Sequence, residues 1–145
     1  MVRHRIASYA QQSQRYVDFK IPNYVVPPKI AKNKKMKKAY DKTMETIWDQ
    51  YNSLLDMKIP AEDARFVLPN AACTNIMVTM NARSLLNFFE LRTCLHAQWE
   101  IRELANKMLK EVKKVAPTIF KNAGPSCKTK KICPENKKDC PLYPK

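Results

Sequence analysis

Gly124 is the only glycine among 145 residues, and this constrains the fold more than any other feature of the chain. Phosphate-binding loops of the P-loop and dinucleotide-binding kinds need several glycines, because their backbone must approach the phosphate closely. Neither kind of loop can be built from this sequence. The chain is long enough for one domain with a hydrophobic core, so any phosphate or nucleotide that it binds must be held by side chains.

The net charge of +14 is concentrated in the two ends of the chain. Residues 1–38 carry ten lysines or arginines and one acid, and residues 107–145 carry eleven and three. Basic segments of this kind bind nucleic acid or anionic ligands, or only keep a protein dissolved. The lysine runs at 32–38 and 128–138 lack interleaved aromatic residues on which bases would stack, which favours a solvated surface.

Hydrophobic periodicity predicts an α+β protein with a small sheet and about four helices. Residues 3–30 are typical of extended structure, especially Tyr16–Phe19 and Tyr24–Val26. The predicted helices cover residues 31–57, 61–65, 82–94 and 97–115, where Pro117 ends the last one, and a strand is predicted over 74–81. Residues 122–145 hold four prolines and three cysteines, so we expect a domain over 1–121 and an irregular tail over 122–145.

No run of about 18 uncharged apolar residues exists, which excludes a membrane-spanning helix. The charged residues at the N-terminus are not followed by an apolar segment, so no secretory signal peptide is visible. We therefore expect a cytoplasmic protein.

Basic and polar side chains form two clusters. In an extended segment alternate side chains share a face, so Arg3 and Arg5 project together and His4 points the other way. Ser13 and Arg15 likewise share a face, and arginine with serine offers donors that match phosphate oxygens. The alternative is a sheet edge that carries solvated charges, but the whole cluster favours an anion-binding site.

The second cluster lies on the helix predicted over 82–94. Arg83 and Asn87 are four residues apart and share a helical face, and Arg92 and His96 are expected to form a second such pair. Nine steps of roughly 100° separate Arg83 from Arg92, so the pairs face opposite directions and could serve two ligands or two subunits. The apolar positions of this helix are predicted to form core: Leu85, Leu86, Phe88, Phe89 and Leu91.

These motifs resemble the flavin-dependent thymidylate synthases. Arg3-His4-Arg5, seven residues and then Ser13 reproduce the signature of that family. The resemblance continues from residue 2 to about residue 125, through the segments Ala64–Pro69, Thr79–Arg92 and His96–Arg102. It implies an α+β fold of that family and methylation of deoxyuridine monophosphate (dUMP) to thymidylate (dTMP). Methylenetetrahydrofolate would supply the carbon, NADPH would supply electrons through FAD, and active sites would lie between the subunits of a homotetramer.

The resemblance also implies roles for individual residues. Flavin contacts are implied for Arg3, His4, Arg5, Gln11, Asn81, Arg83, Asn87 and His96. Contacts with dUMP are implied for Arg3, Gln11, Ser13, Gln14, Arg15, Arg65 and Arg92. Arg92 would be the catalytic residue, because positive charge at the pyrimidine favours ionisation at N3.

Two features depart from the family pattern. Members of the family carry a substantial segment before the signature, so the chain is expected to be the C-terminal portion of such an enzyme. Made alone, it is expected to bind FAD weakly or not at all and to have little activity. Many members also carry Glu where this chain has Gln11. Two alternatives therefore stay open: an inactive or partner-dependent fragment of this enzyme, and a basic nucleic-acid-binding module.

The five cysteines predict no metal site and no nucleophile. Cys73 and Cys94 have no activating partner in the sequence, which favours buried structural thiols. Cys127, Cys133 and Cys140 lack a CxxC pair, and three ligands could hold zinc only with a fourth ligand from elsewhere. We therefore expect free thiols in the tail.

Overall fold

The computed structural model describes residues 4–144 and divides into two compact units. The first, which we call the α4–α5 unit, consists of the two segments Met1–Ser8 and Val78–Lys145. The second, which we call the α2 unit, covers Tyr9–Met77. The expected domain over 1–121 with a tail over 122–145 stays a prediction. No helix in residues 4–144 is long and apolar enough to cross a membrane.

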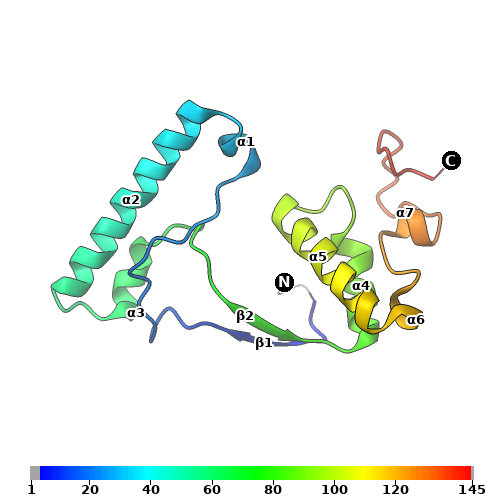
Figure 1. Ribbon diagram of the computed structural model, residues 1–145, viewed down its shortest axis with the longest axis horizontal. Coiled ribbons are helices and arrows are strands. Elements are labelled where there is room, and N and C mark those ends of the chain that lie inside the picture. Colours follow the sequence, from blue (N-terminus) through cyan, green and yellow to red (C-terminus); the bar gives the residue numbers. More distant parts are fainter. Residues whose placement is uncertain (1–3, 145) are drawn as a thin grey trace. The chain divides into compact units, whose positions relative to one another are not determined.

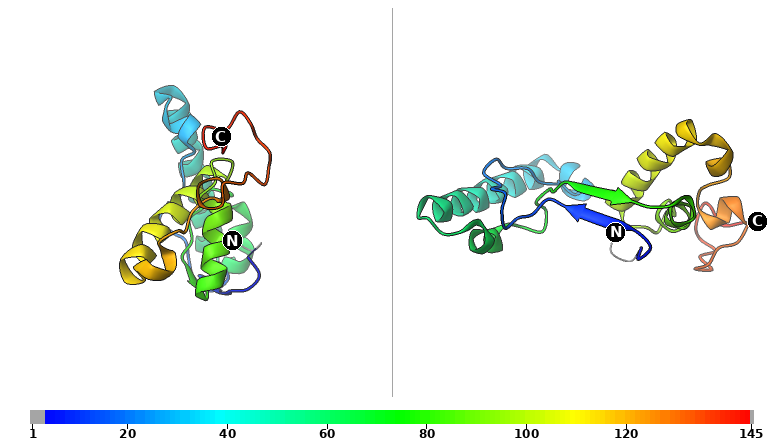
Figure 2. Two further views of the ribbon diagram at one scale, coloured as in Figure 1. Left: turned by 90° about the vertical axis from the view of Figure 1, so that its right-hand side faces the viewer. Right: turned by 90° about the horizontal axis from the view of Figure 1, so that it is seen from below.

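The predicted α+β class is confirmed. Two short strands, β1 (Ser8–Gln11) and β2 (Ile76–Thr79), pair with each other and run in opposite directions (Figures 1 and 2). Strand β2 lies inside the range predicted from alternation, 74–81. The described residues form seven α-helices instead of about four, because three single-turn helices escape a search for periodicity.

The α2 unit is organised around one long helix. Its helical elements are α1 (Pro28–Ala31), α2 (Lys34–Asp56), α3 (Ala61–Ala64) and the 3-10 turn η1 (Arg65–Val67). Helix α2 begins after Asn33, whose Oδ1 accepts hydrogen bonds from the amides of Lys35 and Met36 at 3.0 and 3.1 Å. It buries Met44, Trp48 and Tyr51 on one face, as the hydrophobic periodicity of residues 31–57 predicts.

The segments Tyr16–Phe19 and Tyr24–Val26, expected to be extended, form no strand among the described residues, apart from a single bridge between Tyr24 and Ala72. Side chains of α2 satisfy these backbone groups instead. Trp48 Nε1 donates to the Phe19 carbonyl at 2.8 Å, and the Phe19 amide donates to Tyr51 Oη at 3.2 Å. Tyr16 and Val17 lie in a turn instead of extended chain, because β-branched and aromatic residues also suit an irregular segment.

The α4–α5 unit contains four helices: α4 (Ala82–Arg92), α5 (Trp99–Val115), α6 (Pro117–Phe120) and α7 (Ser126–Thr129). Phe88 and Phe89 of α4 pack with Ala105 of α5 and Phe120 of α6 as the buried core. The Phe88–Phe89 and Phe89–Phe120 rings meet edge to face, with centroids 5.7 and 6.0 Å apart. Leu91, expected in this core, is instead 47% exposed. Pro117 follows the end of α5 as predicted and also begins α6.

The tail beyond residue 121 is more ordered than expected, because α7 docks on the end of α4. Ser126 is buried, and its Oγ donates to Glu90 Oε1 at 2.7 Å, while Lys130 Nζ pairs with Glu90 Oε2 at 2.7 Å. The hydrogen bond from Lys130, assisted by that from Ser126, lowers the pKa of Glu90. The lone glycine, Gly124, enables this turn, since its φ of +156° strains any residue with a Cβ.

Candidate functional site

His4 and Arg92 are brought together within the α4–α5 unit, although 88 positions separate them in the sequence. Arg92, the last residue of α4, donates from Nε to His4 Nε2 at 2.9 Å. The His4 ring also meets Phe88 edge to face at 4.9 Å and is only 7% exposed. Arg3, predicted beside them, lies outside the described residues.

The hydrogen bond from Arg92 favours the neutral form of His4. Burial is the largest cause that lowers the pKa of His4, and the charge of Arg92 lowers it further. Because Nε2 accepts the Arg92 hydrogen bond, the ring proton is assigned to Nδ1. A protonated His4 would lose this acceptor and would face a second cation, so the contact requires neutral histidine.

The start of α4 carries three of the predicted flavin residues. Asn81 is the N-cap, and its Oδ1 accepts from the Ser84 amide at 2.9 Å. Arg83 and Asn87 are exposed on the following two turns, and their spacing of four places them on one helical face as predicted. Arg5, from the opposite end of the unit's sequence, is also exposed.

His96 does not form the predicted helical pair with Arg92. Helix α4 ends at Arg92, and His96 lies in the turn that precedes α5. That turn needs no glycine: Thr93 is the C-cap, and its Oγ1 donates to the Phe89 carbonyl at 2.6 Å. The exposed His96 side chain lines a cavity beside the tail. The prediction of two opposed pairs on one helix was therefore wrong in its second half.

The α2 unit brings Arg15 and Arg65 to the same acid, Glu62. Arg15 donates from Nε to Glu62 Oε2 at 2.9 Å and pairs with it through Nη2 at 2.7 Å. Arg65 donates from Nε to the Glu62 backbone carbonyl at 3.0 Å. One N–H of the five on the Arg65 guanidinium serves that bond, so its fork of Nη donors can still meet an anion.

The remaining predicted residues of the first cluster lie in and after β1. Gln11 is exposed at the end of the strand, and Gln14 is half-buried in the following turn. Ser13 Oγ accepts from the Arg15 amide at 3.1 Å, which fixes the turn that carries Arg15.

Sequence reasoning missed Glu62 and Gln12. Gln12 joins the end of β1 to the start of β2, since its Oε1 accepts from Asn75 Nδ2 at 2.8 Å and its amide donates to the Asn75 carbonyl at 2.8 Å. No sequence signal indicated that pair. The pairing of the Glu62 carboxylate with Arg15 also left no sequence signal, because 47 positions separate the two residues.

Comparison with known proteins identifies the family of this chain. Residues 1–118 match the family described as thymidylate synthase complementing protein. The chain belongs to this family. It is 56% identical over 142 residues to the flavin-dependent thymidylate synthase of Geobacter sulfurreducens and 50% identical over 156 residues to that of Clostridium tetani. The flavin-dependent thymidylate synthase of Saccharolobus solfataricus is 52% identical over 130 residues.

The chain spans only part of each relative. The three comparisons cover 97%, 97% and 88% of this chain, but 61%, 62% and 49% of the Geobacter, Clostridium and Saccharolobus enzymes.

Proposed function

We propose that this chain takes part in flavin-dependent thymidylate synthesis, the reductive methylation of dUMP to dTMP. Methylenetetrahydrofolate gives up its methylene carbon and leaves as tetrahydrofolate, and two electrons from NADPH reduce that carbon to a methyl group. When bound, FAD carries those electrons. The observation that supports this proposal best is the Arg3-His4-Arg5, seven residues, Ser13 signature in a chain 56% identical to an enzyme of that name.

For dUMP, we infer a phosphate site at Arg15 and Arg65, with Ser13, Gln11 and Gln14 beside them. The carboxylate of Glu62 holds Arg15 in place and offsets part of its charge, while Arg65 is held by the Glu62 backbone carbonyl. The Arg65 fork then supplies the planar pair of donors that suits a phosphate. Its stem is half-buried, and its guanidinium lies over the Phe66 ring at 5.6 Å, which restricts its motion.

For FAD, the exposed side chains of Arg5, Arg83 and Asn87 fit an anionic nucleotide. They offer donors without a glycine-rich loop, as a chain with one glycine requires. Asn81 uses its carbonyl oxygen to cap α4 and keeps its amide NH₂ for a ligand. Arg3 and His96 complete the set that we propose for the flavin.

For the reaction itself, Arg92 is the residue that we propose next to the pyrimidine. Its Nε is fixed by His4, so the two Nη groups are turned to a defined direction. A fixed cation favours loss of the N3 proton from the pyrimidine ring and stabilises the negative charge that develops there. His4 acts through Arg92 as a positioning residue.

We further propose the fold of the family, a homotetramer and a cytoplasmic location. Association is supported by apolar side chains on the surface of both units, such as Phe66, 80% exposed, and Val115, 86% exposed. A homotetramer would cover such side chains. Nucleotide precursors and NADPH are metabolites of the cytoplasm, which supports the location.

The experiment that tests the substrate proposal compares dUMP with deoxyuridine by calorimetric titration of the 145-residue chain. A phosphate site predicts that dUMP binds at least about tenfold more tightly, since charge-assisted hydrogen bonds contribute about 1.5–3 kcal/mol. Arg65→Ala should abolish this preference for the phosphorylated ligand. Lys29→Ala removes an exposed cation from α1 in the same unit and should leave the preference unchanged.

Two further measurements separate the alternatives. Flavin absorbance after gel filtration with FAD, with and without dUMP, reports cofactor binding, and thymidylate formation with both co-substrates reports turnover. Equal affinity for dUMP and deoxyuridine would contradict the proposed phosphate site. Binding of dUMP without FAD binding or turnover would favour the partner-dependent fragment.

A further inference from the structure

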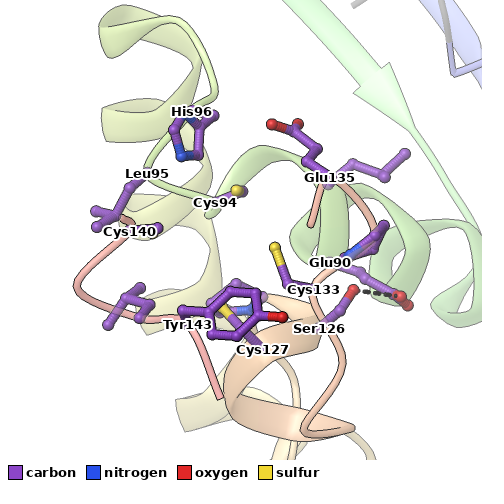
Figure 3. A pocket seen from close by; sticks show the side chains of 14 residues that line it. Glu90, Cys94, Leu95, His96, Ser126, Cys127, Cys133, Glu135, Cys140 and Tyr143 are labelled. Carbon is purple, nitrogen blue, oxygen red and sulfur yellow. Dashed lines mark hydrogen bonds between the residues drawn. The ribbon is translucent and has the colours of Figure 1, made fainter. Parts of the chain in front are cut away.

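Four of the five cysteines line one cavity of the α4–α5 unit (Figure 3). Cys94 comes from the turn after α4, Cys127 from α7, and Cys133 and Cys140 from the tail. The three tail cysteines lacked a fourth partner in the sequence, and the fold supplies it from a position 33 residues before the first of them. Figure 3 shows Cys94 and Cys133 with their sulfur atoms turned toward the same space, and His96 stands at the edge.

The size of the cavity limits what it can hold. Its volume is about 70 Å³. Sites for cofactors and drug-sized molecules occupy about 300–1,000 Å³, whereas a single water needs about 10–15 Å³. The cavity is therefore too small for a nucleotide or flavin and large enough for an ion with its ligand atoms.

We propose that this cavity is a structural zinc site with Cys94, Cys127, Cys133 and Cys140 as ligands. Four thiolates give the closed tetrahedral coordination of structural zinc, with zinc–sulfur distances of about 2.3 Å. Sulfur ligands select zinc over magnesium or calcium, which prefer oxygen. The proposal is independent of the thymidylate synthase activity, since none of the four thiols has a role in it.

The charge around the tail suits such a site. Four thiolates around Zn²⁺ leave a net charge of −2, and five lysines lie between Cys127 and Cys140. These are Lys128, Lys130, Lys131, Lys137 and Lys138. The same lysine run that looked like a simple solvated surface thus offsets the charge that metal binding would create.

The thiols must turn to meet a common ion. As the side chains lie, no three His, Cys, Asp or Glu groups among residues 4–144 are arranged to hold a metal. Cys133 and Cys140 each begin a turn: the Cys133 carbonyl accepts from the Asn136 amide at 3.1 Å, and the Cys140 carbonyl accepts from the Tyr143 amide at 2.9 Å. Both turns lie outside regular helix, so rotation of these side chains toward Cys94 breaks no helical hydrogen bond.

The test is the zinc content of the full chain, expressed with added Zn²⁺ and purified under reducing conditions. The expected result is one zinc per chain, measured by mass spectrometry of the metal and retained on gel filtration. Cys133→Ser should weaken zinc binding at least about tenfold in a chelator competition, because even changes around the ligands cost that much. Cys73→Ser, in the α2 unit, is the matched control and should leave the affinity unchanged.

A second measurement keeps the proposal testable if Cys133→Ser fails to fold. Co²⁺ added to the metal-depleted wild-type chain should give the thiolate-to-cobalt charge-transfer band and the strong visible bands of tetrahedral sulfur coordination. A chain that retains no zinc, or a Co²⁺ spectrum without the charge-transfer band, would overturn the proposal. So would thiol titration and mass spectrometry showing these four cysteines paired as two disulfides in the metal-free, folded chain.

Discussion

His4 and Arg92 share one hydrogen bond that constrains both residues. The bond fixes the direction of the Arg92 guanidinium, and it needs a His4 ring without a proton on Nε2. Packing against Phe88 keeps the ring in place and keeps water away from it. The protonation state of His4, in the N-terminal signature, therefore controls the position of Arg92 at the end of α4.

The first prediction concerns the titration of His4. Its pKa is lowered from 6.5 by burial and by the charge of Arg92. The folded chain therefore binds this proton less readily than the unfolded chain, so the free energy of unfolding decreases as pH falls below about 6.5. NMR of the ring protons in a His96→Asn variant, which leaves one histidine, should show a midpoint below 6.5. Arg92→Gln should raise that midpoint, because it removes the neighbouring charge.

A midpoint at or above 6.5 in the His96→Asn variant would contradict the neutral His4 that the hydrogen bond requires. Arg102→Gln is the control, since Arg102 donates to the Leu95 carbonyl at 2.7 Å on the surface and has no contact with His4 among the bonds described. It should leave the His4 midpoint unchanged.

At this scale the sequence predicted which residues form an anion site and missed how they pair. Arginine, histidine and serine in the signature spacing indicated an anion site, because each of these side chains is able to donate hydrogen bonds. The His4–Arg92 and Arg15–Glu62 pairs join residues 88 and 47 positions apart. Contacts over such separations depend on the tertiary fold and leave no local pattern.

Helix α2 depends on one side chain at its start. Asn33 satisfies two amides of the first turn, which would otherwise lack partners. We predict that Asn33→Ala lowers the free energy of unfolding by about 1 kcal/mol, while Asn33→Asp retains the acceptor and costs less. Urea unfolding followed by Trp48 fluorescence, in a Trp99→Phe background, measures both. Equal decreases in the free energy of unfolding for the two variants would show that the side-chain acceptor at position 33 contributes little.

The attachment of α7 depends on Glu90. This carboxylate accepts from Ser126 and Lys130, so Glu90→Gln should release the tail and speed tryptic cleavage at Lys128, Lys130 and Lys131. Because the pKa of Glu90 is lowered from 4.5, its charged form persists at pH 4.5 and the attachment is lost only as pH falls through that lower value. Tryptic digestion of wild type and Glu90→Gln at neutral pH compares their rates of cleavage in the tail.

Glu103→Gln is the control for the tail, since Glu103 pairs only with Lys107 in its described contacts on α5. Unchanged cleavage in Glu90→Gln would show that apolar packing around the buried Pro125 holds α7 without the carboxylate. Bound zinc should slow cleavage further, and chelation should reverse that effect in wild type.

Periodicity predicted the long helices because their apolar stripes are repeated over several turns. Helices α1, α6 and α7 contain four residues each, too few for a repeat. Tyr16–Phe19 misled because β-branched and aromatic residues are typical of extended chain, whereas Tyr16 and Val17 lie in a turn. The error at His96 has a local cause, since the Thr93 C-cap ends α4 without the glycine or proline that usually marks a helix end.

The whole molecule divides in a way that the sequence did not indicate. The N-terminal residues join the unit built by residues 78–145, and the boundary falls within both strands. Composition could not predict this, because the two strands pair across more than 60 residues. Composition excluded glycine-rich loops because the chain has one glycine, and it left open which partner the charge of +14 binds.

Salt dependence distinguishes a nucleotide enzyme from a nucleic-acid-binding module. A protein that contacts about 6–10 phosphates of DNA loses about 10³–10⁵ in affinity between 50 and 200 mM salt. A ligand with a single phosphate group, such as dUMP, should lose much less, below about tenfold, since few counterions are released. We predict that any binding of a 20-mer oligonucleotide disappears at 200 mM salt while dUMP binding persists. Fluorescence anisotropy and calorimetry in the same salt series measure the two ligands.

The lysines at the start of α2 provide the variant for this comparison. Replacing Lys34, Lys35, Lys37 and Lys38 by Gln removes four exposed cations from one helical segment and leaves Arg15 and Arg65 in place. Oligonucleotide binding at 50 mM salt should fall, with a smaller salt slope, because each phosphate contact contributes to that slope. The affinity for dUMP should not change. Oligonucleotide affinity that survives 200 mM salt, together with dUMP affinity that does not, would instead assign the basic surface to nucleic acid.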